Sequence, residues 1–229
     1  MRDMTQLDGK VAVITGGAGG IGLALAHRFR RAGMRIALAD VEADALDAAV
    51  ADLGGADDVF AATCDVTDLA DVHRFRDAVL AHFGAAHVVC ANAGVAPSGP
   101  ILGTSIESWR WVMDVNVMGV VHTIDAFGAT LVGQADGHFV LTASAAGLST
   151  TPGLGAYSAT KHAVVGTAAT LHAELAGTGV GVSVLCPGLV RTRIFESERN
   201  RPDDAESHHH PATADLFRGI VPGLSLIHI

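Results

Sequence analysis

The sequence predicts an α/β fold: a single domain built on a Rossmann-like, doubly wound parallel sheet in three layers. Short apolar runs alternate along the chain with alanine-rich stretches of helical length, a pattern typical of right-handed βαβ crossovers. The apolar runs are continuous, as expected for strands that are covered on both faces. The length of 229 residues suits one domain of this kind.

Six strands and five connecting helices follow from this pattern. The expected strands are Lys10–Thr15, Arg35–Asp40, Val59–Cys64, His87–Ala91, Gly137–Ala143 and Val180–Cys186. The expected helices are Gly20–Ala32, Glu42–Leu53, Leu69–Phe83, Ser105–Leu131 and Gly155–Ala176. The carboxyl ends of parallel strands meet at one edge of a sheet, so we expect the ligand crevice there.

Composition and charge restrict the classes of function. The net charge of −9 and the absence of a basic stripe argue against a nucleic-acid partner. No signal peptide or uninterrupted apolar span is evident, so no membrane partner is expected. Cys64, Cys90 and Cys186 lie in or at the end of strand-like runs. We expect them to be reduced, buried thiols of a cytoplasmic protein.

A glycine-rich turn joins the first expected strand to the first helix. From Gly16 to Gly22 it has the spacing Gly-x-x-x-Gly-x-Gly. Glycines let the backbone approach a pyrophosphate, and the helix N-terminus offers N–H groups to the anion. Gly22 would let the helix pack close to the sheet. The turn therefore predicts a dinucleotide site; a tight turn without a ligand is the alternative.

Asp40 ends the second expected strand. A carboxylate at this place can accept hydrogen bonds from the adenosine ribose and repels a 2′-phosphate, so NAD is expected as cofactor, with NADP less favoured. The residues that follow, Val41 and Glu42, add no positive charge. A helix-capping role is the alternative, and it is compatible with ribose binding.

Tyr157 and Lys161 lie four residues apart on an expected helix and so share one face. The ammonium should lower the pKa of Tyr157, the only tyrosine of the chain, so that it exchanges protons near neutrality. Ser144 ends the fifth expected strand and could hydrogen-bond the substrate oxygen, although a turn cap is the alternative. The segment Asn92-Ala93-Gly94 follows the fourth strand in the same way.

In their order and spacing, these pieces resemble the short-chain dehydrogenase/reductase family of the plain, single-domain kind. The resemblance covers residues 7 to about 195. The matching residues are Thr15-Gly16, Gly20-Ile21-Gly22, Asp65-Val66, Asn92-Ala93-Gly94, Asn116, Ser144, Tyr157, Lys161, Pro187-Gly188 and Thr192.

The resemblance implies an oxidoreductase that transfers a hydride between NAD(P) and a secondary alcohol or its ketone, without a metal. Tyr157 would be the acid/base, and Lys161 would bind the nicotinamide ribose. Ser144 would orient the substrate oxygen. Asn116 would hold a water that links Lys161 to solvent; a polar contact between helices is the alternative. The implied cofactor contacts are Gly16, Gly20, Ile21, Gly22, Asp40, Asp65, Val66, Asn92, Gly94, Tyr157, Lys161, Pro187, Gly188, Val190 and Thr192.

The C-terminal part departs from the family pattern. We expect residues 1–195 to form the dinucleotide-binding catalytic domain and residues 196–229 a substrate-lid segment with a non-native end at 224–229. The family continues through another helix and a seventh strand, which we do not find, so truncation is expected. We interpret His208–His210 as a solvated run, because no cysteine or carboxylate lies at ligand spacing around it.

The residues expected near the pocket are mostly apolar, which favours a small apolar alcohol or ketone as substrate. They are Val95, Pro97, Leu148, Pro152, Leu154, Leu189, Ile194 and Phe195. By resemblance, a homodimer or homotetramer is expected. Two alternatives stay open: a 3-ketoacyl-thioester reductase that uses NADPH, disfavoured by Asp40, and a non-catalytic dinucleotide-binding protein, owing to the truncation.

Overall fold

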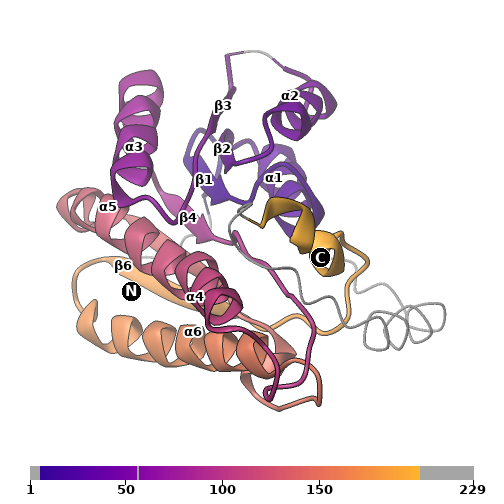
Figure 1. Cartoon of the computed structure of the whole chain (residues 1–229). Coiled ribbons are helices and arrows are strands. Elements are labelled where there is room, and N and C mark those ends of the chain that lie inside the picture. The colour runs from indigo at the N-terminus through magenta and orange to yellow at the C-terminus, as the bar shows by residue number, and fades with distance from the viewer. Residues whose placement is uncertain (1–5, 56, 202–229) are drawn as a thin grey trace.

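The computed structural model describes residues 6–55 and 57–201. Six parallel strands form one sheet in the order β3-β2-β1-β4-β5-β6, with helices on both faces (Figure 1). The strands are β1 (Val11–Thr15), β2 (Arg35–Asp40), β3 (Val59–Thr63), β4 (Val88–Ala91), β5 (Gly137–Thr142) and β6 (Val180–Leu185). The helices are α1 (Gly20–Arg31), α2 (Ala43–Asp52), α3 (Leu69–Phe83), α4 (Ile106–Met113), α5 (Gly119–Gln134) and α6 (Gly155–Glu174). The predicted three-layer, doubly wound fold is confirmed.

The strand order reverses at β1, which pairs with β2 on one side and with β4 on the other. In open α/β sheets the crevice at such a reversal, beyond the carboxyl ends of the strands, is where ligands bind. The glycine turn after Thr15 and the Asn92 segment after Ala91 both leave the sheet at this point.

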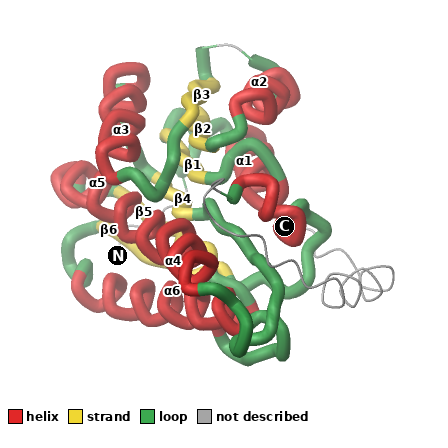
Figure 2. The backbone as a smooth tube through the Cα atoms, viewed as in Figure 1, coloured by secondary structure: helices red, strands yellow, loops and turns green. Residues whose placement is uncertain are grey.

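The two faces of the sheet carry separate apolar clusters. Phe75 of α3, Phe127 of α5 and Val164 of α6 pack with Phe139 on one face. Leu25 of α1 and Leu46 of α2 pack on the other face, against strand residues that alternate with those of the first cluster. Figure 2 shows α3, α5 and α6 gathered on one side of the strands, with α1 and α2 on the other. Residues 6–55 and 57–201 supply no helix over the α1/α2 face of β5 and β6.

The predicted helix Ser105–Leu131 is not regular. The segment η1 (Asp114–Met118) is a π-helix inserted between α4 and α5, and the amide of Gly119 bonds back to the carbonyl of Asp114. Hydrophobic periodicity averages over such an extra residue, so the pattern predicted one α-helix. Single π-turns of this kind occur often at functional sites, and η1 contains Asn116.

By length and composition, Ile106–Gln134 is also apolar enough to cross a membrane. In the fold, α5 contacts α3, β4 and β5, and α4 contacts α6. Phe127 and Leu131 are fully buried in the first apolar cluster. This packing is that of a core helix that covers the sheet.

Two short 3-10 helices complete the described chain: η2 (Ala145–Gly147), directly after β5, and η3 (Ile194–Asn200), in the predicted lid region. The ends of the other predicted helices and strands lie within one or two residues of the ends in the structure. The His208–His210 run and the 224–229 end lie outside the described residues.

Candidate active site

The carboxyl ends of the strands open into a cavity of about 900 Å³. Nearly all the predicted site residues line it, although they come from segments far apart in sequence. Those lining the cavity are Gly16, Gly20, Ile21, Asp40, Asp65, Val66, Asn92, Gly94, Ser144, Tyr157, Lys161, Pro187, Gly188, Val190 and Thr192. Gly22 and Asn116 are buried and do not line it.

The glycine turn is shaped as a phosphate-binding turn requires. Gly16 and Gly20 have φ angles of 62° and 54°, in the left-handed region that favours glycine. A Cβ atom on Gly22 would overlap the carbonyl oxygen of Gly16. No side chain caps the N-terminus of α1, which starts at Gly20 and borders the cavity. The turn and the helix end therefore fit the pyrophosphate of a dinucleotide.

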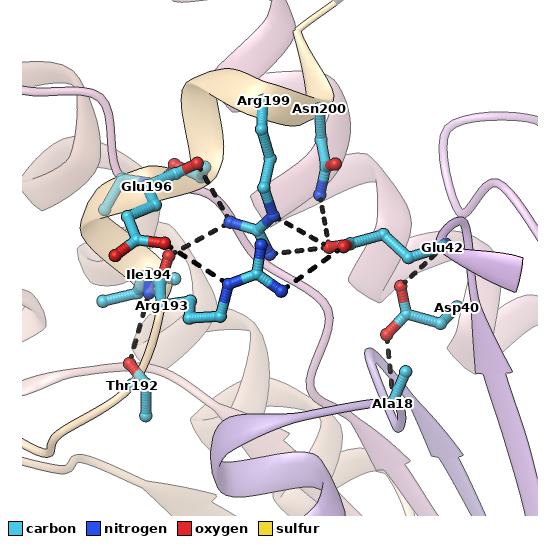
Figure 3. A network of polar contacts seen from close by, with 11 residues as sticks. Ala18, Asp40, Glu42, Thr192, Arg193, Ile194, Glu196, Arg199 and Asn200 are labelled. Carbon is cyan, nitrogen blue, oxygen red and sulfur yellow. Dashed lines mark hydrogen bonds and ion pairs between the residues drawn. The ribbon is translucent and has the colours of Figure 1, made fainter. Parts of the chain in front are cut away.

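Asp40 joins the glycine turn to the end of β2. Its Oδ2 accepts a hydrogen bond of 3.1 Å from the amide of Ala18, and its Oδ1 accepts one of 3.2 Å from the amide of Glu42 (Figure 3). The helix-capping alternative is wrong, because the cap position of α2 is Glu42, whose side chain makes no capping bond. Each carboxylate oxygen can accept further bonds, so Asp40 fits ribose hydroxyls.

Asn92 and Thr15 fasten the glycine turn to the neighbouring strands. The hydroxyl of Thr15 accepts hydrogen bonds from the amides of Asn92 (3.0 Å) and Ala93 (3.2 Å). The Asn92 side-chain amide donates to the carbonyls of Thr15 and Gly16, both at 3.1 Å. Its oxygen accepts from Thr142 of β5 at 3.2 Å. Asn92 therefore steadies the cavity floor across β1, β4 and β5.

Asp65 and Val66 lie beyond the end of β3. The Oδ1 of Asp65 accepts hydrogen bonds from the amide (2.9 Å) and hydroxyl (2.8 Å) of Thr67, which makes a compact turn. Val66 is buried, and a Cβ on Gly119 would crowd its side chain. The segment thus presents a fixed wall at the β3 side of the cavity.

Asn116 bridges three elements from inside η1. Its Oδ1 accepts a hydrogen bond of 2.8 Å from the amide of Val95, and its Nδ2 donates to the Val95 carbonyl at 2.9 Å. The Nδ2 also donates to the Thr160 hydroxyl of α6 at 3.0 Å. Asn116 is fully buried. The side chain therefore makes the polar contact between helices considered above, and the water relay stays a prediction.

Tyr157, Lys161 and Ser144 converge on the cavity. Lys161 is buried, and its ammonium donates a 2.9 Å hydrogen bond to the carbonyl of Thr142. The ammonium lies 5.6 Å from the centre of the Tyr157 ring. Ser144 lies near enough to the Tyr157 hydroxyl to affect its pKa, and its Oγ accepts a hydrogen bond from the amide of Ala146 at 3.1 Å. Ser144 therefore caps the turn that starts η2, as the alternative interpretation expects, and also borders the same cavity as Tyr157.

The electrostatics of this trio differ from the expectation. Burial raises the pKa of Tyr157 above its usual value, and the hydrogen bond from Ser144 offsets this only in part. Burial also lowers the pKa of Lys161 to about 8. The net shift of the Tyr157 pKa is therefore upward and not downward as expected, because burial is its largest cause.

The cavity wall on the substrate side is mixed in character. Of the apolar residues expected there, the structure places five in the wall: Val95, Leu154, Leu189, Ile194 and Phe195. The lining of the cavity does not include the other three, Pro97, Leu148 and Pro152. The sequence interpretation missed three charged residues of α4 and η1 that border the cavity: Glu107, Arg110 and Asp114.

Other residues that shape the site had no role assigned to them from the sequence. The partners of Asn92, Asn116 and Lys161 are threonines at strand ends or on α6: Thr15, Thr142 and Thr160. Hydroxyl residues at the ends of buried strands could have indicated them. The polar network of Glu42 with Arg193 and Arg199 (Figure 3) had no such indication, because Glu42 and Arg199 lie 157 positions apart.

A phosphate-binding turn, an acidic residue after β2 and a Tyr–Lys–Ser trio with a buried lysine define a nicotinamide-dependent oxidoreductase. The model of the short chain dehydrogenase family matches residues 10–203. The chain belongs to this family, and the resemblance inferred from its motifs is confirmed. It is an NAD(P)-dependent oxidoreductase of the alcohol–ketone type.

Three relatives illustrate the match. The 1-deoxy-11-beta-hydroxypentalenate dehydrogenase of Streptomyces exfoliatus is 43% identical over 196 residues, which cover 83% of this chain and 71% of the relative. The D-threitol dehydrogenase of Mycolicibacterium smegmatis is 38% identical over 192 residues, covering 82% and 73% of the two chains. The crystal structure of a short chain dehydrogenase/reductase from Burkholderia phymatum in complex with NAD superposes with a TM-score of 0.92. It is 41% identical and covers 97% of this chain and 83% of its own.

Proposed function

We propose that this protein interconverts a small secondary alcohol and its ketone, with NAD as the preferred cofactor and Tyr157 as the acid/base. The observation that carries the proposal is the trio of Tyr157, Lys161 and Ser144, which borders one cavity together with the glycine turn. These groups have the chemistry that proton transfer to or from an alcohol oxygen needs.

The residues of the cavity fit a nicotinamide dinucleotide. The uncapped N-terminus of α1 would hold the pyrophosphate, and Asp40 would accept bonds from the adenosine ribose. The carboxylate of Asp40 disfavours a 2′-phosphate, which supports NAD over NADP. The related protein from Burkholderia phymatum, whose structure is in complex with NAD, supports the same assignment.

In the mechanism, Ser144 and Tyr157 hydrogen-bond the substrate oxygen and hold it at the cavity wall. Tyr157 takes the hydroxyl proton during oxidation and returns it during reduction. When bound, the nicotinamide ring supplies the hydride chemistry. Lys161, anchored on Thr142, keeps positive charge beside the tyrosine and favours its ionised form as the proton moves. Two of the three ammonium N–H groups remain for the ribose hydroxyls of the cofactor.

The substrate we propose has an apolar body. Val95, Leu154, Ile194 and Phe195 contribute apolar wall to the cavity that Tyr157 borders. The ring of Trp111 adds to this wall and is nearly buried. Apolar walls with few polar groups favour ligands of matching polarity.

We also propose that the protein is a homo-oligomer built through α4 and α5. This helix pair exposes large apolar side chains along its outer surface, where single exposed apolar residues would be unremarkable but a row of them favours an interface. They are Met113, Met118, Val121 and Val132. Light scattering of the purified chain measures the oligomeric state.

A screen for NAD reduction over a panel of secondary alcohols, each tested with NAD and with NADP, tests the proposed function. We expect turnover with at least one apolar secondary alcohol and a preference for NAD. Cofactor binding without turnover on any alcohol or ketone would favour the non-catalytic alternative. Faster turnover of a 3-ketoacyl thioester with NADPH would favour the thioester reductase.

A further inference from the structure

Glu42 is the centre of a polar network between the start of α2 and η3. Its Oε1 accepts hydrogen bonds from Arg199 Nη2 (2.6 Å), Arg199 Nε (3.1 Å) and Asn200 Nδ2 (3.2 Å). Its Oε2 forms an ion pair of 3.6 Å with Arg193 Nη1. Figure 3 shows both guanidinium groups turned toward Glu42, with Asp40 and Ala18 below it in the view. Residues of the lid region therefore reach the end of the cavity where Asp40 lies.

Both arginines in this corner of the cavity have further partners besides Glu42. Arg193 also pairs with Glu196 at 3.3 Å, and Arg199 donates to the carbonyls of Arg193 and Glu196. These bonds to η3 hold the Arg199 guanidinium in place independently of Glu42. The guanidinium of Arg199 lowers the pKa of Glu42, so Glu42 is ionised at neutral pH.

We infer that Glu42 is a specificity-determining residue for the cofactor, because it occupies Arg193, directly before η3, and Arg199 of η3, which would otherwise bind a 2′-phosphate. Arginine is the side chain best suited to a phosphate, and an arginine already engaged by a carboxylate is not available for one. Glu42 also adds a second negative charge beside Asp40. The inference rests on the proposed NAD preference and assigns part of it to contacts between α2 and η3.

The position of η3 does not depend on Glu42 alone. The hydroxyl of Ser197, which is buried, accepts a 2.9 Å hydrogen bond from the amide of Ala96. Arg201 donates to the Ser108 hydroxyl at 2.9 Å, and its guanidinium carbon lies 4.5 Å from the centre of the Trp111 ring. These contacts hold η3 on the substrate side of the cavity. Neutralising Glu42 should therefore release Arg199 from its only carboxylate partner among the described residues without displacing the helix.

Fluorescence titration with NADH and with NADPH measures the two affinities in wild type and variants, independently of turnover. In Glu42→Gln, we expect the affinity for NADPH relative to NADH to rise about tenfold, the gain of one charge-assisted hydrogen bond. Glu42→Ser should show a rise in the same direction. Arg199→Ala breaks the same ion pair but removes a phosphate ligand, so its ratio should stay at the wild-type value or fall.

Glu107→Gln is the matched control for the loss of one negative charge. Glu107 borders the same cavity at α4 and pairs with Arg110 at 3.8 Å, away from Asp40. Its variant should keep the wild-type ratio of affinities. The double variant Glu42→Gln/Arg199→Ala should lose most of the gain seen with Glu42→Gln.

An unchanged ratio in both Glu42 variants, or equal changes in Glu42→Gln and Arg199→Ala, would overturn the inference while leaving the proposed function intact. The second result would mean that the ion pair acts only by holding η3. A wild-type chain that binds neither cofactor would instead contradict the proposed function, and the inference with it.

Discussion

The ammonium of Lys161 lies 5.6 Å from the centre of the Tyr157 ring and donates its hydrogen bond to the carbonyl of Thr142. The buried Lys161 side chain is therefore fixed beside the half-buried Tyr157 ring before any substrate hydroxyl arrives. Burial disfavours the charged form of each, which raises the pKa of Tyr157 and lowers the pKa of Lys161 to about 8. Burial is thus the main cause of both pKa shifts: it raises the pKa of the phenol and lowers the pKa of the amine.

Replacing Lys161 with methionine should change the pH dependence of stability. Burial lowers the pKa of Lys161 from 10.5 to about 8, so the unfolded chain binds more protons than the folded chain between these values. Stability of the wild type therefore rises with pH across this window. Relative to Lys161→Met, the free energy of unfolding of the wild type should increase by roughly 3 kcal/mol from pH 7 to about pH 10.5. Urea unfolding at both pH values measures this, and a difference that is independent of pH would contradict it.

Removing the Asn116 side chain should destabilise the fold. Asn116→Ala leaves the buried amide of Val95 without its 2.8 Å partner and cuts the link to Thr160. We expect a loss of about 2–3 kcal/mol in the free energy of unfolding.

The control is Thr123→Val on α5, because the buried Thr123 hydroxyl bonds only within its own helix, to the Gly119 carbonyl at 2.7 Å. The free energy of unfolding of Thr123→Val should be lower than that of the wild type by less than about 1 kcal/mol. Equal losses in the two variants by urea unfolding would mean that the bridge by Asn116 adds nothing beyond a local hydrogen bond.

Two glycines of the phosphate-binding turn should differ sharply when changed to alanine. A Cβ on Gly22 would overlap the Gly16 carbonyl oxygen and crowd the Asn92 amide, so Gly22→Ala should lose about 3 kcal/mol or more of stability. Gly19 is extended, at φ −167°, and a Cβ there meets no atom within 4 Å. Gly19→Ala should change stability by less than about 0.5 kcal/mol. Thermal unfolding of the pair measures this, and similar midpoints would count against the described turn.

Much of this site could be predicted because its residues follow the ends of predicted elements. The carboxyl ends of parallel strands meet at one edge of the sheet, so the sequence predicts Asp40, Asn92 and Ser144 close together. Lys161 was expected beside Tyr157 because four residues make one helical turn. These inferences need only secondary structure and the parallel arrangement of the strands.

The parts that could not be predicted depend on irregular backbone or on distant pairing. The π-turn at Asn116 departs from the α-helical period by one residue, which a pattern averaged over the helix does not resolve. The ion pair of Glu42 with Arg199 joins two segments whose separation in the sequence carries no spacing rule. The pKa of Tyr157 depends on burial, which neighbouring residue types alone do not report.

Neutralising Asp40 should weaken the preference for NAD. Asp40→Asn keeps the size of the side chain and an oxygen that can accept from the Ala18 amide, but removes the charge that opposes a 2′-phosphate. The ratio of kcat/KM with NADP to kcat/KM with NAD should rise by at least about tenfold. Asp65→Asn, which alters a carboxylate at the β3 side of the same cavity, should leave the ratio unchanged. A ratio that stays at the wild-type value in Asp40→Asn would contradict the assignment.

The central claim is that Tyr157 is the group that exchanges a proton with the substrate oxygen. The most direct test is turnover of Tyr157→Phe, with NADH binding measured by fluorescence in parallel. This variant keeps the ring beside Lys161 and removes only the hydroxyl. We expect kcat to fall by at least about a thousandfold while NADH affinity changes by less than about threefold. Turnover at the wild-type rate in Tyr157→Phe would contradict the account.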